Sequence, residues 1–206
     1  MPRRTKLTLT AFVVFILLSA VAYEMWNVRA QGGPERVGPL VGAAIGGPFR
    51  LIDQDRVVRT SASYKGRYRL MYFGYTYCPD ICPTDVQKMS KALRLFEASD
   101  PRRAARVQPI MVTIDPERDT PAVMKQFVSA FHPRLVGLTG TAAQINDIRS
   151  RFAIYAQRQG PATSGNYLMD HSAMAYLMGP SGEPITFFAR DATPAQMAAE
   201  LSDYVS

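Results

Sequence analysis

Residues 69–98 read RLMYFGYTYCPDICPTDVQKMSKALRLFEA, and this stretch decides the prediction of the fold. Its first part, Arg69–Tyr75, is a short apolar run typical of a buried strand. Its last part, Pro83–Ala98, predicts a helix, because apolar residues recur at helical spacing at positions 86, 89, 93 and 96. The loop between them contains both cysteines, Cys78 and Cys82. A loop that follows a strand and precedes a helix lies at the carboxyl edge of the sheet, where ligand sites of α/β proteins usually form.

Strand and helix patterns alternate on both sides of this stretch. Two runs that flank residues 53–55 predict a hairpin of Phe49–Ile52 with Val57–Thr60. Further strands are expected at Val107–Ile114, Leu135–Leu138, Ile154–Gln157, Ala173–Met178 and Pro184–Phe188, and further helices at Pro121–Phe131, Ala142–Phe152 and Pro194–Tyr204. Such an alternation, with a hairpin at its end, predicts an α/β fold in which helices cover both faces of an open sheet.

The composition excludes several classes of protein. The chain has 206 residues, of which 47% are hydrophobic and 20% charged, so it is not a disordered chain and has the size of one domain with a short extension. Two Cys and two His are too few for a multi-disulfide scaffold, and a four-ligand zinc site would use all four of them. The net charge of +7 lies partly in the N-terminal segment, and no basic stripe typical of a nucleic-acid-binding surface follows it.

The N-terminal segment predicts a membrane anchor. Arg3, Arg4 and Lys6 precede 17 uncharged residues, 7–23. We therefore expect residues 1–6 in the cytoplasm, a single anchor over 7–26, a flexible tether over 27–47 and the folded domain over 48–206. The alternative is a cleaved signal peptide, since residues 20–22 and 28–30 offer small side chains at a cleavage site. Both readings place the domain outside the cytoplasm. We expect the bacterial inner membrane and periplasm, because no Arg- and Ser-rich transit pattern precedes the apolar stretch.

The two cysteines are four residues apart at the start of the expected helix. In a helix-like turn their Cα atoms lie about 6 Å apart, within reach of a disulfide, and their sulfurs share one face. The N-terminus of a helix stabilises a thiolate, and we expect this effect at Cys82. The pair can be a static disulfide, a redox-active dithiol or two ligands of one metal ion. A disulfide that closes so short a ring removes little entropy from the unfolded chain, which argues against a purely structural role.

His171 is the histidine that can join the cysteines. It directly precedes an expected strand, in a loop at the same or an adjacent edge of the sheet. Two thiolates and one imidazole form a soft set of three ligands that suits Cu(I) and accepts Cu(II). Asp170 is a candidate to orient the imidazole, whereas Met169 and Met174 are expected to pack in the core. His132, between a helix and a strand, is interpreted as a loop or capping residue.

Three pieces of the sequence carry a family resemblance. They are GYTYCPDICPTD (74–85), VTIDPERDTP (112–121) and DHSAMAYLMGPSG (170–182). Together they resemble the SCO/SenC family, membrane-anchored copper proteins of thioredoxin-like fold that assist the assembly of cytochrome c oxidase. The resemblance covers most of residues 45–204. Asp115, Pro116 and Asp119 match a motif of the family, and we interpret them as strand-end and helix-entry structure rather than as ligands.

The resemblance implies a copper site at Cys78, Cys82 and His171, with one Cu(I) or Cu(II) ion per chain. It also implies a partner, subunit II of cytochrome c oxidase, whose binuclear CuA centre would receive copper or have its cysteines reduced. Other copper chaperones or thiol reductants would be further partners. The protein is then mainly a metallochaperone.

A periplasmic thiol–disulfide oxidoreductase without a copper-transfer role is the alternative. Thioredoxin-like reductases usually carry Cys-x-x-Cys and a cis-proline before the facing strand. This chain has Cys-x-x-x-Cys, and His171 stands in a stretch, 170–178, that contains no proline. The resemblance therefore favours metal binding over disulfide exchange.

Overall fold

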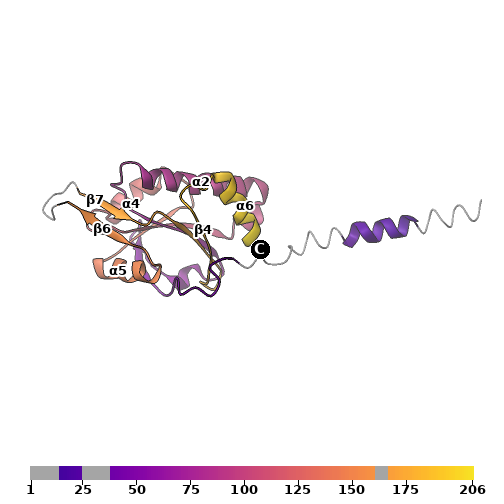
Figure 1. Ribbon diagram of the computed structural model, residues 1–206, viewed down its shortest axis with the longest axis horizontal. Helices are drawn as coiled ribbons and strands as arrows, with labels where there is room; N and C mark the ends of the chain where they lie inside the picture. Colours follow the sequence, from indigo (N-terminus) through magenta and orange to yellow (C-terminus); the bar gives the residue numbers. More distant parts are fainter. Residues whose placement is uncertain (1–13, 25–37, 161–166) are drawn as a thin grey trace, which may run out of the picture. The chain divides into compact units, whose positions relative to one another are not determined.

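The computed structural model describes residues 14–24, 38–160 and 167–206 (Figure 1). At the centre, β3 (Tyr68–Gly74) pairs in parallel with β4 (Val107–Thr113), and every residue of both strands is buried. A strand that is covered on both faces is a near-continuous apolar run, which is why the sequence predicts both strands correctly.

The central sheet is mixed, with seven strands in the order β2-β1-β5-β4-β3-β8-β9. The other five strands are β1 (Arg50–Asp53), β2 (Val58–Thr60), β5 (Val136–Thr139), β8 (Ala175–Met178) and β9 (Pro184–Phe188). β5 runs parallel to β4, whereas β1, β8 and β9 are antiparallel to their neighbours. The expected hairpins are confirmed as β1–β2 and β8–β9.

A separate two-stranded ribbon consists of β6 (Ala156–Gln159) and β7 (Leu168–His171). The strand expected at 154–157 begins two residues later, because Ala153 has a positive φ of 52° and the Ile154 N–H still donates to the Arg149 carbonyl at 2.8 Å. β7 was not predicted, and the strand expected from residue 173 begins only at residue 175. His171 is therefore the last residue of a strand and not part of a loop.

Helices lie on both sides of the central sheet, as expected. They are η1 (Ser61–Tyr64), α2 (Ile81–Ser99), α3 (Pro101–Ala104), α4 (Pro121–Val128), α5 (Ala142–Arg151) and α6 (Pro194–Tyr204). Figure 1 shows α2 and α6 side by side on one side of the sheet and α5 on the other. α2 begins two residues earlier than predicted, so Cys82 lies inside its first turn. α4 ends at residue 128 and not 131.

Threonine caps fix the starts of three helices. Thr120, Thr141 and Thr193 precede α4, α5 and α6, and each side-chain oxygen accepts a backbone N–H of the first turn. Pro121 and Pro194 occupy the first turns of α4 and α6, where a missing N–H costs nothing. These local signals explain why the sequence places the starts of these helices correctly.

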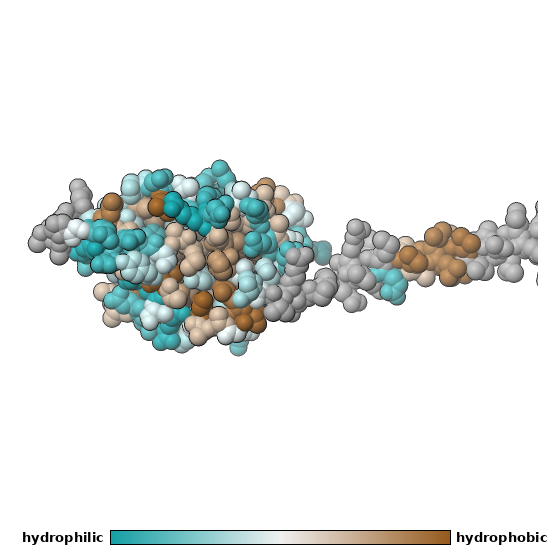
Figure 2. Space-filling model, in the orientation of Figure 1, coloured by the Kyte–Doolittle hydropathy of each residue, from teal (hydrophilic) through white to brown (hydrophobic). Residues whose placement is uncertain are grey.

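Residues 38–47, part of the expected tether, contact the domain. The Leu40 N–H donates to the Ile185 carbonyl at 3.0 Å, and the Gly46 N–H donates to the Arg151 carbonyl at 2.8 Å. Residues 14–24 are helical and expose apolar side chains, which form a brown band in Figure 2. Within the described ranges, no helix has the length and apolar character needed to cross a membrane. The rest of the predicted anchor, and residues 27–37 of the tether, lie outside the described residues.

Candidate metal centre

The two cysteines lie between the end of β3 and the first turn of α2. Both are free thiols; Cys82 is fully buried, and Cys78 is partly exposed. The backbone N–H of Cys82 donates to the Sγ of Cys78 at 3.4 Å. The first turn of α2 thus gives an N–H group to the sulfur of the preceding loop, and this contact holds the two thiols close together.

The environments of the two sulfurs shift their pKa values in opposite directions. Partial burial acts to raise the pKa of Cys78, but backbone N–H groups of Cys82, Asp80 and Ile81 outweigh it and lower that pKa. Burial raises the pKa of Cys82 to about 12, with a contribution from the neighbouring Cys78. The expectation that the helix N-terminus stabilises a thiolate at Cys82 is therefore wrong. The N–H groups at the helix N-terminus stabilise the thiolate of Cys78 instead. At the buried sulfur of Cys82, the cost of desolvating a thiolate is the larger effect.

The end of β7 brings His171 to the buried cysteine. His171 Nε2 lies 3.4 Å from Cys82 Sγ, although the two residues are 89 positions apart in the chain. His171 Nδ1 lies 2.9 Å from the Ser172 carbonyl oxygen, which can only accept, so Nδ1 carries the proton. Burial lowers the pKa of His171 and favours the neutral imidazole. The unprotonated Nε2 therefore points its lone pair towards Cys82. A metal ligand requires this tautomer, in which Nδ1 carries the proton and Nε2 is free to bind.

The partner that orients His171 is not the one expected. Asp170 is exposed, and the Nδ1 proton goes to the carbonyl of Ser172 instead. The ring of Tyr75 meets the imidazole edge-on, with centroids 5.9 Å apart and planes at 84°. Met169, the second residue before His171, is held through its backbone N–H, which donates to the Tyr75 hydroxyl at 3.1 Å. The Ser172 carbonyl thus takes the role expected of the aspartate, and the buried Tyr75 ring packs against the imidazole.

The donor separation fits a soft metal ion. Two ligands at a tetrahedral angle, with bonds of about 2.3 Å to sulfur and about 2.0 Å to nitrogen, are about 3.5 Å apart. The separation of 3.4 Å between Cys82 Sγ and His171 Nε2 matches this value. Among residues 14–24, 38–160 and 167–206, no three His, Cys, Asp or Glu side chains already form a metal-ligand cluster. The structure therefore brings two of the three predicted donors into ligand spacing, and the sulfur of the third, Cys78, accepts the backbone N–H of Cys82.

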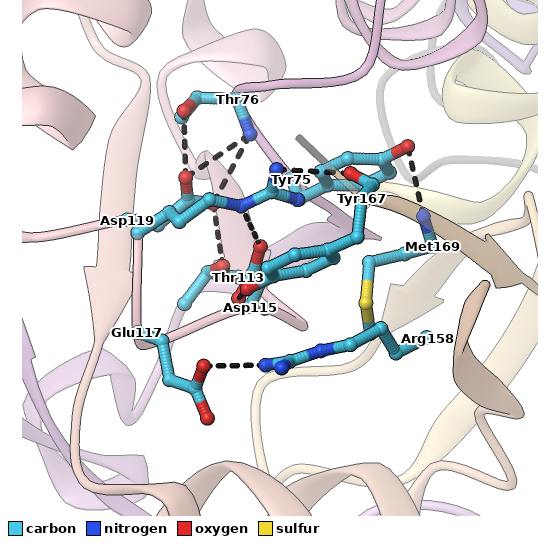
Figure 3. A network of polar contacts seen from close by, with 10 residues as sticks. Tyr75, Thr76, Thr113, Asp115, Glu117, Asp119, Arg158, Tyr167 and Met169 are labelled. Atoms are coloured by element: carbon cyan, nitrogen blue, oxygen red, sulfur yellow. Dashed lines mark hydrogen bonds and ion pairs between the residues drawn. The ribbon is translucent and has the colours of Figure 1, made fainter. Parts of the chain in front are cut away.

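The segment 114–120, which follows β4, carries a network of polar contacts that the sequence does not predict (Figure 3). Asp119 is fully buried and accepts hydrogen bonds from the Thr76 N–H at 3.0 Å, the Thr76 hydroxyl at 2.6 Å and the Thr113 hydroxyl at 2.6 Å. Burial raises the pKa of its carboxyl. Asp119 thus ties the segment to the loop two residues before Cys78, while Thr120 caps α4. Asp115 and Pro116 follow the end of β4, as interpreted, but the helix-entry role belongs to Thr120 and not to Asp119.

The remaining candidates of the sequence have structural surroundings. His132 is buried, with Nε2 3.1 Å from Glu97 Oε2 and Nδ1 accepting the Arg134 N–H at 3.2 Å. Met169 and Met174 are partly buried and pack against the hydrophobic core. This agrees with the loop role expected of His132 and the packing role expected of the methionines.

Known proteins resemble this chain in sequence and in fold. The model of the family described as SCO1/SenC matches residues 38–206. The mitochondrial SCO2 homologue of Bos taurus is 38% identical over 206 residues, which cover 98% of this chain and 74% of that protein. The copper-bound structure of Bradyrhizobium japonicum ScoI is 42% identical with a TM-score of 0.70, covering 78% of this chain and 99% of that one. Yeast Sco1 with copper bound is 32% identical with a TM-score of 0.72, covering 78% and 88%.

The sheet and the dithiol at the start of α2 define a thioredoxin-like domain. Within that class, the chain belongs to the SCO1/SenC family. The family expected from the sequence and the thioredoxin-like fold of the domain are confirmed, whereas the transmembrane anchor stays a prediction.

Proposed function

We propose that this protein binds one copper ion per chain through Cys78, Cys82 and His171, as cargo for the assembly of cytochrome c oxidase. The observation that carries the proposal is the 3.4 Å separation of Cys82 Sγ from His171 Nε2. Two thiolates and a neutral imidazole are soft donors of the kind that Cu(I) prefers. The copper-bound structures of the Bradyrhizobium japonicum and yeast relatives support the same cargo.

The receiving partner in this proposal is the CuA centre on subunit II of cytochrome c oxidase. The family membership supports the oxidase as partner. The partial exposure of Cys78 supports a handover that begins at this sulfur, because an incoming thiolate can reach it from solvent. Cys82 and His171 would release the ion afterwards.

The proposal places the domain in the periplasm on a single N-terminal anchor over residues 7–26. The uncharged run after Arg3, Arg4 and Lys6 supports it. Fractionation of the full chain tests it: the protein should stay with washed membranes and be cut by protease added to spheroplasts. Recovery of the chain in the soluble cytoplasmic fraction would refute the anchor and the location.

Titration of the reduced full-length protein with Cu(I), against a chromogenic chelator, tests the copper site. We expect one ion per chain, and we expect His171→Ala to weaken binding while His132→Ala leaves it unchanged. His132 is the control, because it is a hydrogen-bonded histidine too but lies buried on the connection between α4 and β5. Equal copper affinity of wild type and His171→Ala would remove the imidazole from the site.

A thiol–disulfide reductase is the second candidate, and the lowered pKa of Cys78 favours it. In that reaction the Cys78 thiolate attacks a partner disulfide and forms a mixed disulfide, and one partner thiolate leaves. Cys82 then attacks the mixed disulfide, so the partner gains two electrons and both its thiols while Cys78 and Cys82 become a disulfide. This activity should survive His171→Ala and disappear in Cys78→Ser. Loss of both activities in Cys78→Ser, but of copper binding alone in His171→Ala, would show that one site supports both.

A further inference from the structure

β7 carries His171 but does not belong to the central sheet. In the described residues its strand partner is β6, and neither strand pairs with the seven strands that hold the cysteine loop. Backbone hydrogen bonds of the central sheet therefore do not fix the distance between His171 and Cys82. Besides the short connection 172–174 to β8, side-chain contacts between the ribbon and the domain position His171.

Tyr167, the residue directly before β7, is enclosed by such contacts (Figure 3). Its hydroxyl donates to Asp115 Oδ1 at 2.7 Å. Arg118 donates through Nε to Asp115 Oδ2 at 2.6 Å and through Nη1 to the Tyr167 carbonyl at 2.9 Å. The guanidinium carbon of Arg118 also lies 3.6 Å from the centroid of the Tyr167 ring. We call Asp115, Arg118 and Tyr167 the clamp; it joins the segment after β4 to the start of β7.

The clamp continues towards the imidazole through Tyr75. Arg118 Cζ lies 5.7 Å from the centroid of the Tyr75 ring, within the range of a cation–π contact. The Tyr75 hydroxyl receives the backbone N–H of Met169, and its ring packs edge-on against His171. Arg118 is therefore in contact with both aromatic rings that support β7, one at its start and one beside its end.

The buried surroundings of Arg118 favour an arginine at this position. The side chain of Asp115 is 3% exposed and that of Arg118 is 13% exposed, so solvent screens their ion pair weakly. A planar guanidinium can donate to a carboxylate, donate to a carbonyl and stack on a ring at the same time, which a lysine ammonium cannot. The position thus requires an arginine for geometry as well as for charge.

We propose that Arg118 is a positioning residue for the copper site: through Asp115, Tyr167 and Tyr75 it holds β7 so that His171 Nε2 faces Cys82 Sγ. This inference rests on the proposed copper function, and it adds a residue that touches neither the ion nor its ligands. Removing a group that hydrogen-bonds directly to a metal-bound histidine typically costs about 10–100-fold in metal affinity, and Arg118 lies one contact further out, behind Tyr75. We therefore expect Arg118→Ala to cost about tenfold in Cu(I) affinity, the lower end of that range. Arg118→Lys should recover little of this loss, and Tyr167→Phe, which keeps the ring, should cost less.

A double-mutant cycle with His171→Ala tests the route of the effect. If Arg118 acts through the imidazole, Arg118→Ala should no longer change copper affinity once His171 is absent. Equal losses with and without His171 would overturn the proposal. If wild type binds no copper, the proposed function fails; if wild type binds copper, His171→Ala weakens it and Arg118→Ala does not, only the positioning role fails.

A copper-free measurement separates positioning from general destabilisation. Hydrogen exchange of the Met169 amide, followed by NMR in the apo protein, should become faster in Arg118→Ala, because its acceptor Tyr75 loses support. Arg59→Ala is the control: its Nε donates to the buried Asp53 Oδ2 at 2.7 Å, also an arginine–aspartate pair with a buried carboxylate, on the β1–β2 hairpin at the opposite edge of the sheet from β8 and β9. It should change neither the Met169 exchange rate nor the Cu(II) absorption spectrum. Faster Met169 exchange in Arg59→Ala, or unchanged exchange in Arg118→Ala, would overturn the proposal.

Discussion

Gly74, the last residue of β3, leaves room for the buried cysteine. A Cβ added there would lie 2.9 Å from Cys82 Sγ and 2.6 Å from Tyr72 Cε1, whereas ordinary contacts begin at 3.4 Å. In Gly74→Ala the sulfur therefore has to move by about 0.5 Å. Cys82 Sγ lies 3.4 Å from His171 Nε2, so we expect this displacement to disturb the spacing of the two donors.

The size of the two expected effects follows from this geometry. Overpacking of a close-packed core costs about 1–3 kcal/mol of the free energy of unfolding, and each kcal/mol lowers Tm by about 2–4 °C in domains of this size. A ligand set tolerates displacements of at most about 0.5 Å. We therefore expect Gly74→Ala to lower Tm by several degrees and to weaken Cu(I) binding by at least about tenfold.

Gly137→Ala is the control for the stability loss. A Cβ on Gly137, in β5, would lie 2.9 Å from Met124 Cε and 2.9 Å from Val128 Cγ1, so it creates a similar clash in another part of the core. Scanning calorimetry should give a comparable fall in Tm for both variants, and chelator competition should give normal Cu(I) affinity for Gly137→Ala. A Gly74→Ala protein with reduced Tm and wild-type copper affinity would refute the reasoning. Copper binding would then tolerate a displacement of Cys82 Sγ relative to His171 Nε2.

Three further predictions concern single groups. In the reduced, copper-free protein, iodoacetamide should modify Cys78 well before Cys82, since the first is partly exposed and the second fully buried; equal rates by mass spectrometry would contradict this. Burial acts against the charge of Asp53, but hydrogen bonds from Arg59 and two backbone N–H groups lower its pKa, so the stability lost in Asp53→Asn should be full above pH 3.8 and shrink as pH falls below it. Urea unfolding of wild type and Asp53→Asn at pH 7 and pH 3 measures this loss. A loss of equal size at both pH values would count against a stabilising pair of Asp53 and Arg59. Thr193→Ala should cost about 1 kcal/mol in urea unfolding, because α6 loses its N-cap; no change would mean that the cap is replaced.

The sequence predicts those parts of the fold that local signals encode. β3 and β4 are continuous apolar runs, and the starts of α4 and α6 carry a Thr-Pro pair that both caps the helix and begins it. β7 has no such signal. Its four residues, Leu-Met-Asp-His, show no strong alternation, and its pairing with β6 depends on a contact made only in the folded chain.

The sequence predicts the donor residues of the site, but it predicts neither their pKa shifts nor the contacts that position them. Cysteine and histidine are readable as soft donors from residue type alone, and the expected pair of Cys82 and His171 lies at 3.4 Å in the structure. Their electrostatics depend on burial, which is why the thiolate expected at Cys82 belongs to Cys78. Arg118 finds its aromatic partner 49 residues later, so neither spacing nor composition can reveal its contacts.

The two halves of the site are held by different means, and this difference bears on how a cargo ion can enter and leave. Cys82 sits in the 19-residue helix α2, whose inner face is part of the hydrophobic core, so its sulfur can move only if the core moves. His171 sits on a two-stranded ribbon outside the central sheet, joined to the domain by a few polar and aromatic contacts. Segments with few such contacts open locally at a lower free energy than core helices do. In the proposed function, a donor that withdraws while the other stays fixed would let the ion leave without unfolding the domain, and the clamp around Arg118 would set how easily that withdrawal occurs.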